Sequence, residues 1–342
     1  MPEQGESPGR GNCLFAMNKS PENSVAVIIP TCGSNDDYLN CLRSLSQQTY
    51  TPLEVILVTN SIDGNLWESV RVNFPHVKLV MNNENLLFAK SQNIGINLTK
   101  GELILCLNDD VELEPLFITK LVEALTLYPK AGMACGKVLR QDKKTIDTTG
   151  LFLGKSRKPV ERGYGTIDIG RYNKAEYIFG AAAVAVLFKR EMLEDIKLNG
   201  EYFDEDFQIF YEDLDLSWRA NLLGWKAYYV PGAVAYHVRG GTAKSKKPKF
   251  KFLEKYNFSW LPRELKTHLV KNRYMAMIKN DTLPDFLLTL PFIICYELKL
   301  WGYVLLFEPY LIRDTIKNLK YFKSAYNKRK TLREKIKCAK KS

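Results

Sequence analysis

The sequence lacks the features that identify several large classes of protein. Its composition, with 46% hydrophobic residues and a mean hydropathy of -0.22, excludes a polytopic membrane protein and wholesale disorder. The seven cysteines form no C-x-x-C pair, so we expect reduced thiols and neither a zinc site nor a redox motif. The first 23 residues contain no basic segment followed by an apolar one, so we expect no secretory signal and a cytoplasmic location.

Positive charge is concentrated in the C-terminal third. Residues 315–342 hold eleven Lys or Arg against Glu334, a net charge of +10, and residues 243–274 hold a net +8, which leaves -7 for the rest of a chain at +11. This distribution indicates a basic attachment surface more than a basic active site. Because the common nucleic-acid-binding signatures are missing, an anionic membrane surface is the expected partner and nucleic acid is not.

An apolar stretch precedes the basic tail. Residues 283–312 contain two apolar runs with several aromatic residues, interrupted by Pro291, Glu297, Lys299 and Glu308. Each run is too short to cross a bilayer, which takes about 20 apolar residues, so the stretch favours a helical hairpin lying in the membrane interface. The alternative is a pair of apolar helices that closes against the main domain or a second subunit.

The first half of the chain alternates strand and helix patterns. Its four apolar runs predict buried strands at Val25–Pro30, Glu54–Val58, Val77–Met81 and Leu103–Leu107. Segments with helical spacing follow each of them, so the sequence predicts an α/β fold with a doubly wound, mostly parallel sheet. Ligands bind at the carboxyl ends of such strands, so the loops at residues 30–35, 59–64 and 108–111 should line one crevice.

The second half is less regular. A strand with small residues is predicted at Phe179–Val186, a helix with an acidic first turn at Glu212–Leu223, and two short strands at Tyr228–Pro231 and Ala233–His237. No internal repeat is present. The organisation we expect is a disordered segment over residues 1–22, an α/β domain over 23–242, and a basic, partly apolar helical extension over 243–342.

Two groups of polar residues suggest chemistry. Asn108, Asp109 and Asp110 follow a buried strand, where carboxylate oxygens suit Mg²⁺ or Mn²⁺ shared with a phosphate, although such a triplet also forms turns and helix caps. The predicted helix at 212–223 offers three carboxylates, which could also simply favour a helix N-terminus. His237, at a strand end, could bind a metal or a phosphoryl oxygen or be structural.

These patterns stand in one order along the chain. They are Val25–Thr31, Cys41–Leu45 with Gln48–Tyr50, Asn85–Lys90 with Asn93–Gly95, Leu107–Val111, Gly180–Ala182, Phe203–Glu205, Glu212–Leu216 with Arg219, Gly224–Lys226 and His237. Their order and spacing resemble the family 2 inverting glycosyltransferases of the GT-A type, and most of all the bacterial rhamnosyltransferase-like branch that builds cell-surface polysaccharides. The resemblance covers residues 24–242, extends weakly to 271–273, and implies a GT-A catalytic domain with a C-terminal helical extension.

The resemblance implies a role for each matching residue. Asp110 would bind Mg²⁺ or Mn²⁺, His237 would complete the metal or diphosphate site, and Asp213 would be the general base for the acceptor hydroxyl. Pro30 and Thr31 would hold the base and ribose of the donor. The full donor-binding set is Pro30, Thr31, Thr59, Asp63, Lys90, Asn93, Asn108 and Asp109.

The activity that the resemblance implies is metal-dependent transfer of a hexosyl or rhamnosyl group from a UDP- or dTDP-sugar to a hydroxyl of a glycan or lipid-linked glycan. Such an in-line displacement needs a carboxylate to take the acceptor proton and a cation to neutralise the departing nucleoside diphosphate. We expect a peripheral protein on the inner face of the cell membrane, and a homo-oligomer is compatible with the sequence.

Two residues depart from the family pattern. Thr59 stands where the family usually has a base-contacting Asp, a role that Asp63 could take, and Asn108 replaces the first acid of the D-x-D motif. The alternative reading is a non-catalytic nucleotide-sugar-binding or scaffold subunit, which the intact Asp110, Asp213 and His237 disfavour. A nucleotidyltransferase is disfavoured because no glycine-rich loop follows the first strand.

Overall fold

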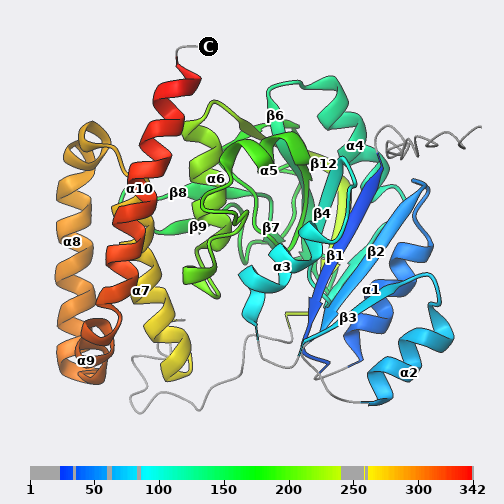
Figure 1. The fold of residues 1–342 in the computed structure, drawn as a ribbon, viewed down its shortest axis with the longest axis horizontal. Helices are drawn as coiled ribbons and strands as arrows, with labels where there is room; N and C mark the ends of the chain where they lie inside the picture. The colour runs from blue at the N-terminus through cyan, green and yellow to red at the C-terminus, as the bar shows by residue number, and fades with distance from the viewer. Residues whose placement is uncertain are drawn as a thin grey trace, which may run out of the picture.

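The computed structural model describes residues 24–33, 36–59, 64–82, 86–239, 258 and 261–340. The predicted disordered segment, the predicted domain boundary at 242 and the candidate Asp63 lie outside these residues. A ten-stranded mixed sheet, ordered β10-β12-β6-β11-β4-β1-β2-β3 along its main path, forms the centre of the described chain. Figure 1 shows helices on both faces of this sheet and a separate layer of helices from the C-terminal part of the chain.

The four strands predicted in the first half form one parallel block. They are β1 (Val25–Thr31), β2 (Leu53–Thr59), β3 (Lys78–Met81) and β4 (Leu103–Leu107), paired in the order β3-β2-β1-β4. The helices between and after them are α1 (Asp37–Ser46), α2 (Gly64–Asn73), α3 (Leu87–Asn97) and α4 (Phe117–Leu127). The α/β prediction for this half is therefore confirmed.

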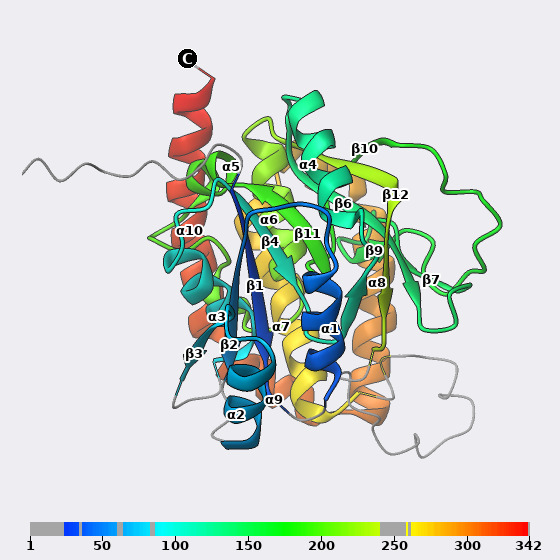
Figure 2. The ribbon, with the colours of Figure 1, turned by 90° about the vertical axis from the view of Figure 1, so that its right-hand side faces the viewer.

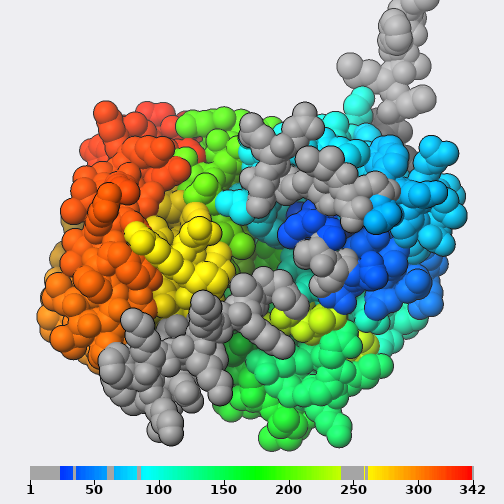
Figure 3. Space-filling model, turned by 90° about the horizontal axis from the view of Figure 1, so that it is seen from below, coloured from blue at the N-terminus to red at the C-terminus, as the bar shows by residue number. Residues whose placement is uncertain are grey.

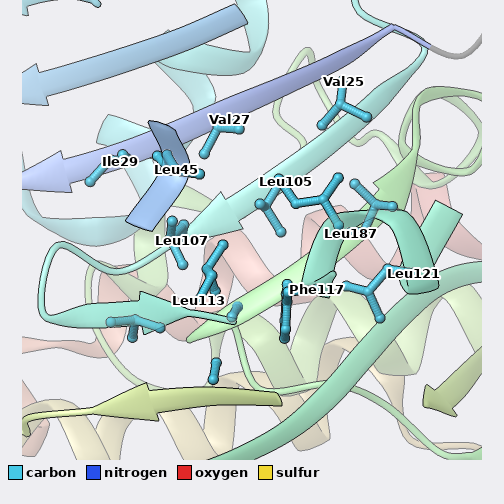
Figure 4. Packing of buried hydrophobic residues seen from close by; sticks show 14 of the residues in the cluster. Val25, Val27, Ile29, Leu45, Leu105, Leu107, Leu113, Phe117, Leu121 and Leu187 are labelled. Carbon is cyan, nitrogen blue, oxygen red and sulfur yellow. The ribbon is translucent and has the colours of Figure 1, made fainter. Parts of the chain in front are cut away.

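Side chains of the central strands alternate between two apolar cores. Val25, Val27 and Ile29 of β1 pack with α1 and α4 on one face, as Figure 4 shows, while Ala26 and Ile28 pack on the other face. Both faces of the block are covered, which is why its central strands β1 and β4 are apolar along nearly their whole length. Six cysteines of the described chain are free, in agreement with the expected thiols.

The remaining strands extend the sheet in mixed directions. They are β5 (Val111–Leu113), β6 (Ala131–Arg140), β7 (Ile146–Thr148), β10 (Glu176–Ile178), β11 (Ala185–Lys189) and β12 (Lys226–His237). Strand β11 runs antiparallel between β4 and β6, whereas β12 runs parallel to β6. A separate pair, β8 (Leu151–Leu153) and β9 (Pro159–Glu161), forms a small hairpin.

Two strand predictions in this half were wrong. The strand expected over 179–186 begins only at Ala185, because residues 179–184 pass as a loop beneath α6 (Glu212–Leu222). There a Cβ on Gly180 would lie 2.4 Å from the side chain of Ser217, so the small residues serve close approach. The two short strands expected near residues 228–237 are one strand, β12, with a register shift between Val230 and Val234.

The C-terminal helices are α7 (Arg263–Asn280), α8 (Leu283–Phe307), α9 (Tyr310–Lys317) and α10 (Leu319–Ala339). They lie on the side of α6, away from α1 and α2 (Figures 1 and 2). Helices α7 and α10 contact each other, and α7 also contacts α6, so this layer is packed onto the sheet-bearing part.

The predicted helical hairpin was wrong. Helix α8 continues for 25 residues with Pro291 inside it, and by length and composition it is the one helix of the described chain that could cross a membrane. Pro291 leaves one backbone hydrogen bond of the helix unmade without ending it, and the Glu297 carboxylate is satisfied within this apolar helix by hydrogen bonds from Arg273 and Tyr274 of α7. The two apolar runs therefore join into one helix.

Candidate functional site

The carboxyl ends of β1 and β4 meet, as predicted for the crevice. Thr31 Oγ1, at the end of β1, donates a hydrogen bond to Asp109 Oδ2 at 2.5 Å, just after β4. Burial, together with the negative charge of Asp110, outweighs that hydrogen bond and raises the pKa of Asp109 to about 6. Figure 3 shows the face to which these strands lead, hollowed between the yellow of α7 and the blue of the first strand and helix.

The pairing of β5 with β12 brings Asp110 and His237 together. Val111 lies opposite His237 in the antiparallel ladder, and Asp110 Oδ1 lies 3.0 Å from His237 Nε2. The other ring nitrogen, Nδ1, lies 2.7 Å from Oδ2 of the fully buried Asp147. Two residues 127 positions apart are thus joined, and a second carboxylate, that of Asp147, fixes the orientation of the ring.

This arrangement fits a divalent cation. Two neighbouring ligands of an octahedral Mg²⁺, each about 2.1 Å from the ion, lie about 3 Å apart, which is the separation of Asp110 and His237. A histidine that binds metal through Nε2 commonly donates its Nδ1 proton to a carboxylate, here that of Asp147. No cluster of three or more His, Cys, Asp or Glu that could hold a metal occurs among the described residues, so further ligands would come from a bound phosphate and water.

Without a cation the imidazole itself carries charge. Burial disfavours the charged ring, but the hydrogen bonds and charges of Asp110 and Asp147 outweigh burial and raise the pKa of His237 to about 9. Burial also opposes ionisation of Asp147, yet the bond to His237 and the charge of Arg239 hold its pKa below the usual range. The carboxylates of Asp110 and Asp147 therefore stabilise positive charge at this end of the cleft.

Arg239 links Asp147, the partner of His237, to Glu161 at the end of β9. Its Nε donates to Asp147, and one terminal nitrogen donates to Glu161 Oε2 at 3.0 Å. Burial and the negative charges of Asp147 and Asp213 together outweigh Arg239 and raise the pKa of Glu161. Sequence analysis missed Asp147 and Glu161, because they lie in the short strands β7 and β9 and belong to no local motif, whereas Arg239 stands close to the candidate His237.

Asp213 lies in the first turn of α6, half-buried. Its Oδ1 accepts the backbone N–H of Leu214 at 2.7 Å, and its Oδ2 is 3.4 Å from the backbone nitrogen of Ala183. Burial outweighs these hydrogen bonds and raises its pKa. A carboxylate with a raised pKa and partial exposure can accept a proton from a bound hydroxyl group.

Glu212 has a different environment from its neighbour. It is buried, and its Oε2 has no hydrogen-bond partner among the described residues. Burial and the charge of Asp213 raise the pKa of Glu212 well above the usual range, which favours its uncharged form. Of the two carboxyl groups, Asp213 is the partly exposed one and the one open to a bound hydroxyl group.

Helix α7 holds the loop that precedes α6. The side-chain amide nitrogen of Asn272 lies 2.7–2.8 Å from the carbonyl oxygens of Phe207, Ile209 and Phe210. Phe210 and Tyr211 have φ angles of 68° and 70°, which cost residues other than glycine about 1 kcal/mol or more each. The hydrogen bonds from α7 offset this strain, so the C-terminal helices help to place Asp213.

A buried ion cluster fixes the same loop from α7 and α10. Lys279 contacts Asp204 and Asp215, and Lys328 contacts Asp204 at 2.6 Å and Asp206 at 2.9 Å. Lys279 and Lys328 are both buried. The basic character of the C-terminal part is therefore partly neutralised inside the molecule and does not all lie on its surface.

The other candidates take varied places. Pro30 is half-buried opposite Val58, Thr59 is buried at the end of β2, and Lys90 is exposed on α3. Asn108 is half-buried, and its backbone N–H donates to Val184. Both amide protons of Asn93 are used by Phe203 and Glu205, so the structure gives this residue a role in positioning the loop before α6.

Comparison with known proteins identifies a family and several relatives that this chain resembles. Residues 21–261, more than half of the chain, match the family described as glycosyltransferase like family 2. The amylovoran biosynthesis glycosyltransferase AmsB of Erwinia amylovora is 28% identical over 261 residues, which cover 72% of this chain and 79% of AmsB. An N-acetylglucosaminyl-diphospho-decaprenol L-rhamnosyltransferase of Mycobacterium tuberculosis (strain CDC 1551 / Oshkosh) is 27% identical over 57% of this chain and 70% of its own length.

Other matches are partial. The chain spans 28% and 32% of the lengths of two further curated relatives. Among solved structures, GalNAc-T7 with UDP, GalNAc and Mn²⁺ superposes with a TM-score of 0.55 at 14% identity, covering 75% of this chain and 48% of that one. This likeness confirms the expected fold.

Proposed function

Because the chain belongs to the glycosyltransferase like family 2, we propose that it transfers a sugar from a nucleoside-diphosphate donor to a hydroxyl group, with inversion at the anomeric carbon. One observation carries this proposal: residues 183 and 184 lie between the two groups. The Val184 carbonyl accepts the backbone N–H of Asn108, two residues before Asp110, and the Ala183 backbone nitrogen lies 3.4 Å from Asp213 Oδ2. A site for an anionic leaving group and a proton acceptor thus belong to one cleft.

Each residue of the cleft has a chemical task in this proposal. Asp213 accepts the proton of the acceptor hydroxyl as that oxygen attacks the anomeric carbon. Asp110 and His237 would hold Mg²⁺ or Mn²⁺, which when bound neutralises charge on the departing diphosphate. The solved GalNAc-T7 contains UDP and Mn²⁺, which supports this choice of donor and cation. Pro30 and Thr31 would contact the base and ribose at the end of β1.

The relatives support a biosynthetic role. AmsB is named for amylovoran biosynthesis, and the mycobacterial relative is named as a rhamnosyltransferase that acts on a diphospho-decaprenol. We extend this to a glycan or lipid-linked glycan acceptor in cell-surface polysaccharide synthesis, with a UDP- or dTDP-sugar as donor and a hexosyl or rhamnosyl group transferred. Thr59 stands where the family usually has a base-contacting Asp, so we expect it to affect which nucleobase of the donor is bound.

We also propose that α8 lies on the cytoplasmic face of an anionic membrane. The large apolar side chains that α8 leaves exposed are Leu283, Leu287, Leu288, Phe292, Ile294, Leu298, Leu305 and Leu306. Most recur at intervals of three or four residues, so they share one broad helix face. An apolar face beside basic helices combines the two signals that peripheral attachment requires.

Turnover of donor sugars tests the proposed activity. Purified protein is incubated with UDP- and dTDP-sugars and Mn²⁺, and release of the nucleoside diphosphate and transfer to acceptors are measured. Asp213→Asn should lower turnover by about 10² or more while nucleotide binding persists. Asp285→Asn, which changes an acid in the first turn of α8, is the matched control and should have little effect.

Two outcomes would contradict the proposal. Binding of UDP without turnover of any donor would indicate the non-catalytic subunit instead. Near-normal turnover of Asp213→Asn would remove Asp213 as the base and direct attention to Glu212 or Asp215.

A further inference from the structure

A cavity of about 750 Å³ lies between the C-terminal helices and the sheet-bearing part. Its volume falls in the range of about 300–1,000 Å³ that is usual for small-molecule sites. Helices α7 and α8 supply most of its wall, and the turn between β8 and β9 supplies Lys158. The apolar and aromatic side chains of the wall include Leu269, Val270, Tyr296, Leu300, Tyr303 and Phe307.

Positive charge is present at this apolar cavity. Arg273, Lys158 and Lys299 line it, and Arg273 is neutralised by Glu297. Lys158 and Lys299 form no ion pair with any residue that the structure describes, and the Lys158 ammonium lies 5.4 Å from the centre of the Tyr296 ring. Two lysines without a carboxylate partner beside an apolar space suit a ligand that is apolar over most of its length and anionic at one end.

The cavity also borders the proposed catalytic base. Tyr211 lines it and lies two residues before Asp213, directly ahead of α6. Tyr211 is buried, and the α6 helix that carries Asp213 begins at the next residue. A ligand in the cavity would therefore present its anionic end near the cleft.

The cavity also reaches the exposed face of α8. Leu306 lines the cavity and has 75% of its surface exposed, and it belongs to the apolar face proposed to lie on the membrane. An apolar chain could thus enter from the lipid phase without crossing water.

We propose that this cavity binds the lipid end of the acceptor, a hydrocarbon chain that ends in a phosphate or diphosphate. The chain occupies the space between α7 and α8, and the phosphate lies against Lys158 and Lys299. The inference rests on the proposed function and names the class of acceptor that the same cleft serves.

Calorimetry of farnesyl diphosphate with the full chain tests this inference. Metal-free buffer containing a chelator is used, so that the diphosphate is not drawn to the Asp110–His237 site. Farnesyl diphosphate should bind with one-to-one stoichiometry, and both farnesol and inorganic pyrophosphate should bind at least about tenfold more weakly, because each lacks one half of the recognised chemistry.

Two leucines of α8 form a matched pair of variants. Leu306→Glu places a carboxylate at the cavity, whereas Leu298→Glu places one on the same helix away from it, and the two side chains are 75% and 72% exposed. Leu306→Glu should weaken farnesyl diphosphate binding at least about tenfold, and Leu298→Glu should leave it unchanged. Lys158→Gln should weaken farnesyl diphosphate but not farnesol.

The outcomes separate this inference from the proposed function. Absent farnesyl diphosphate binding, equal losses in the two leucine variants, or equally tight binding of pyrophosphate would overturn the inference, even if donor sugars are turned over on soluble acceptors. Binding with the expected variant pattern, but without turnover of any donor, would support the lipid-phosphate site and refute the proposed function.

Discussion

Replacing Lys279 by methionine should lower the free energy of unfolding by about 3 kcal/mol. Lys279 is fully buried and contacts two buried carboxylates, those of Asp204 and Asp215. Breaking a buried ion pair by removing one partner costs about 3–5 kcal/mol. Each carboxylate keeps a second cation, Lys328 for Asp204 and Arg219 for Asp215, so we expect the lower end of that range.

Equilibrium unfolding in urea, followed by tryptophan fluorescence, measures this loss. Arg263→Gln is the control, because its pair with Asp314 also joins two C-terminal helices but lies at the surface, and its unfolding midpoint should hardly move. Sugar transfer by Lys279→Met should fall as well, since the cluster holds the loop before Asp213. A loss below about 1 kcal/mol would show that the buried cluster does not stabilise the chain, and would refute the reasoning.

Three further predictions concern the cleft and the membrane. Glu212→Gln should retain most of the transfer activity, because Glu212 is buried and its raised pKa favours the uncharged form that glutamine mimics; a loss as large as that of Asp213→Asn would contradict this. The acid limb of the pH profile for transfer should lie above the usual pKa range of aspartate, because Asp213 must be ionised to act and burial raises its pKa. Activity is then lost as the pH falls through that raised pKa. An acid limb at or below about pH 4 would exclude Asp213 as the base. The full chain should sediment with anionic vesicles at low salt and be released as the Debye length shrinks from about 10 Å at 0.1 M to about 3 Å at 1 M. The double variant Leu288→Glu, Leu298→Glu should stay in the supernatant, unlike Leu127→Glu on α4, and equal sedimentation of both would contradict the role of α8.

The parallel strands β1–β4 could be predicted from the sequence because the patterns that indicate them are local. Strands β1, β2 and β4 are continuous apolar runs, and their ends follow from the residues that close them. Helix α8 was misread because Pro291 and Glu297 look like breaks in the sequence. The Glu297 carboxylate is satisfied by contacts from α7, which no local pattern reveals.

The candidate site was predictable in part for the same reason. Asp110 and His237 follow strands, so a shared sheet edge could be expected, and the structure places them 3.0 Å apart. Asp147 and Glu161 could not be found, because their role depends on contacts with residues about 80 to 90 positions away. Asn272 lies within residues 271–273, to which the resemblance extends only weakly, and Lys279 belongs to no motif; their roles also depend on contacts with residues more than 60 positions away.

Calorimetry of UDP and dTDP binding, with and without Mn²⁺, tests the central claim most directly. The account places the donor diphosphate on a cation held by Asp110 and His237, so the wild-type chain should bind a nucleoside diphosphate much more tightly when Mn²⁺ is present. Asp110→Ala and His237→Ala should each lose most of that metal-dependent gain. If Asp110→Ala binds with the same dependence on Mn²⁺ as the wild type, the donor site is not where this account places it.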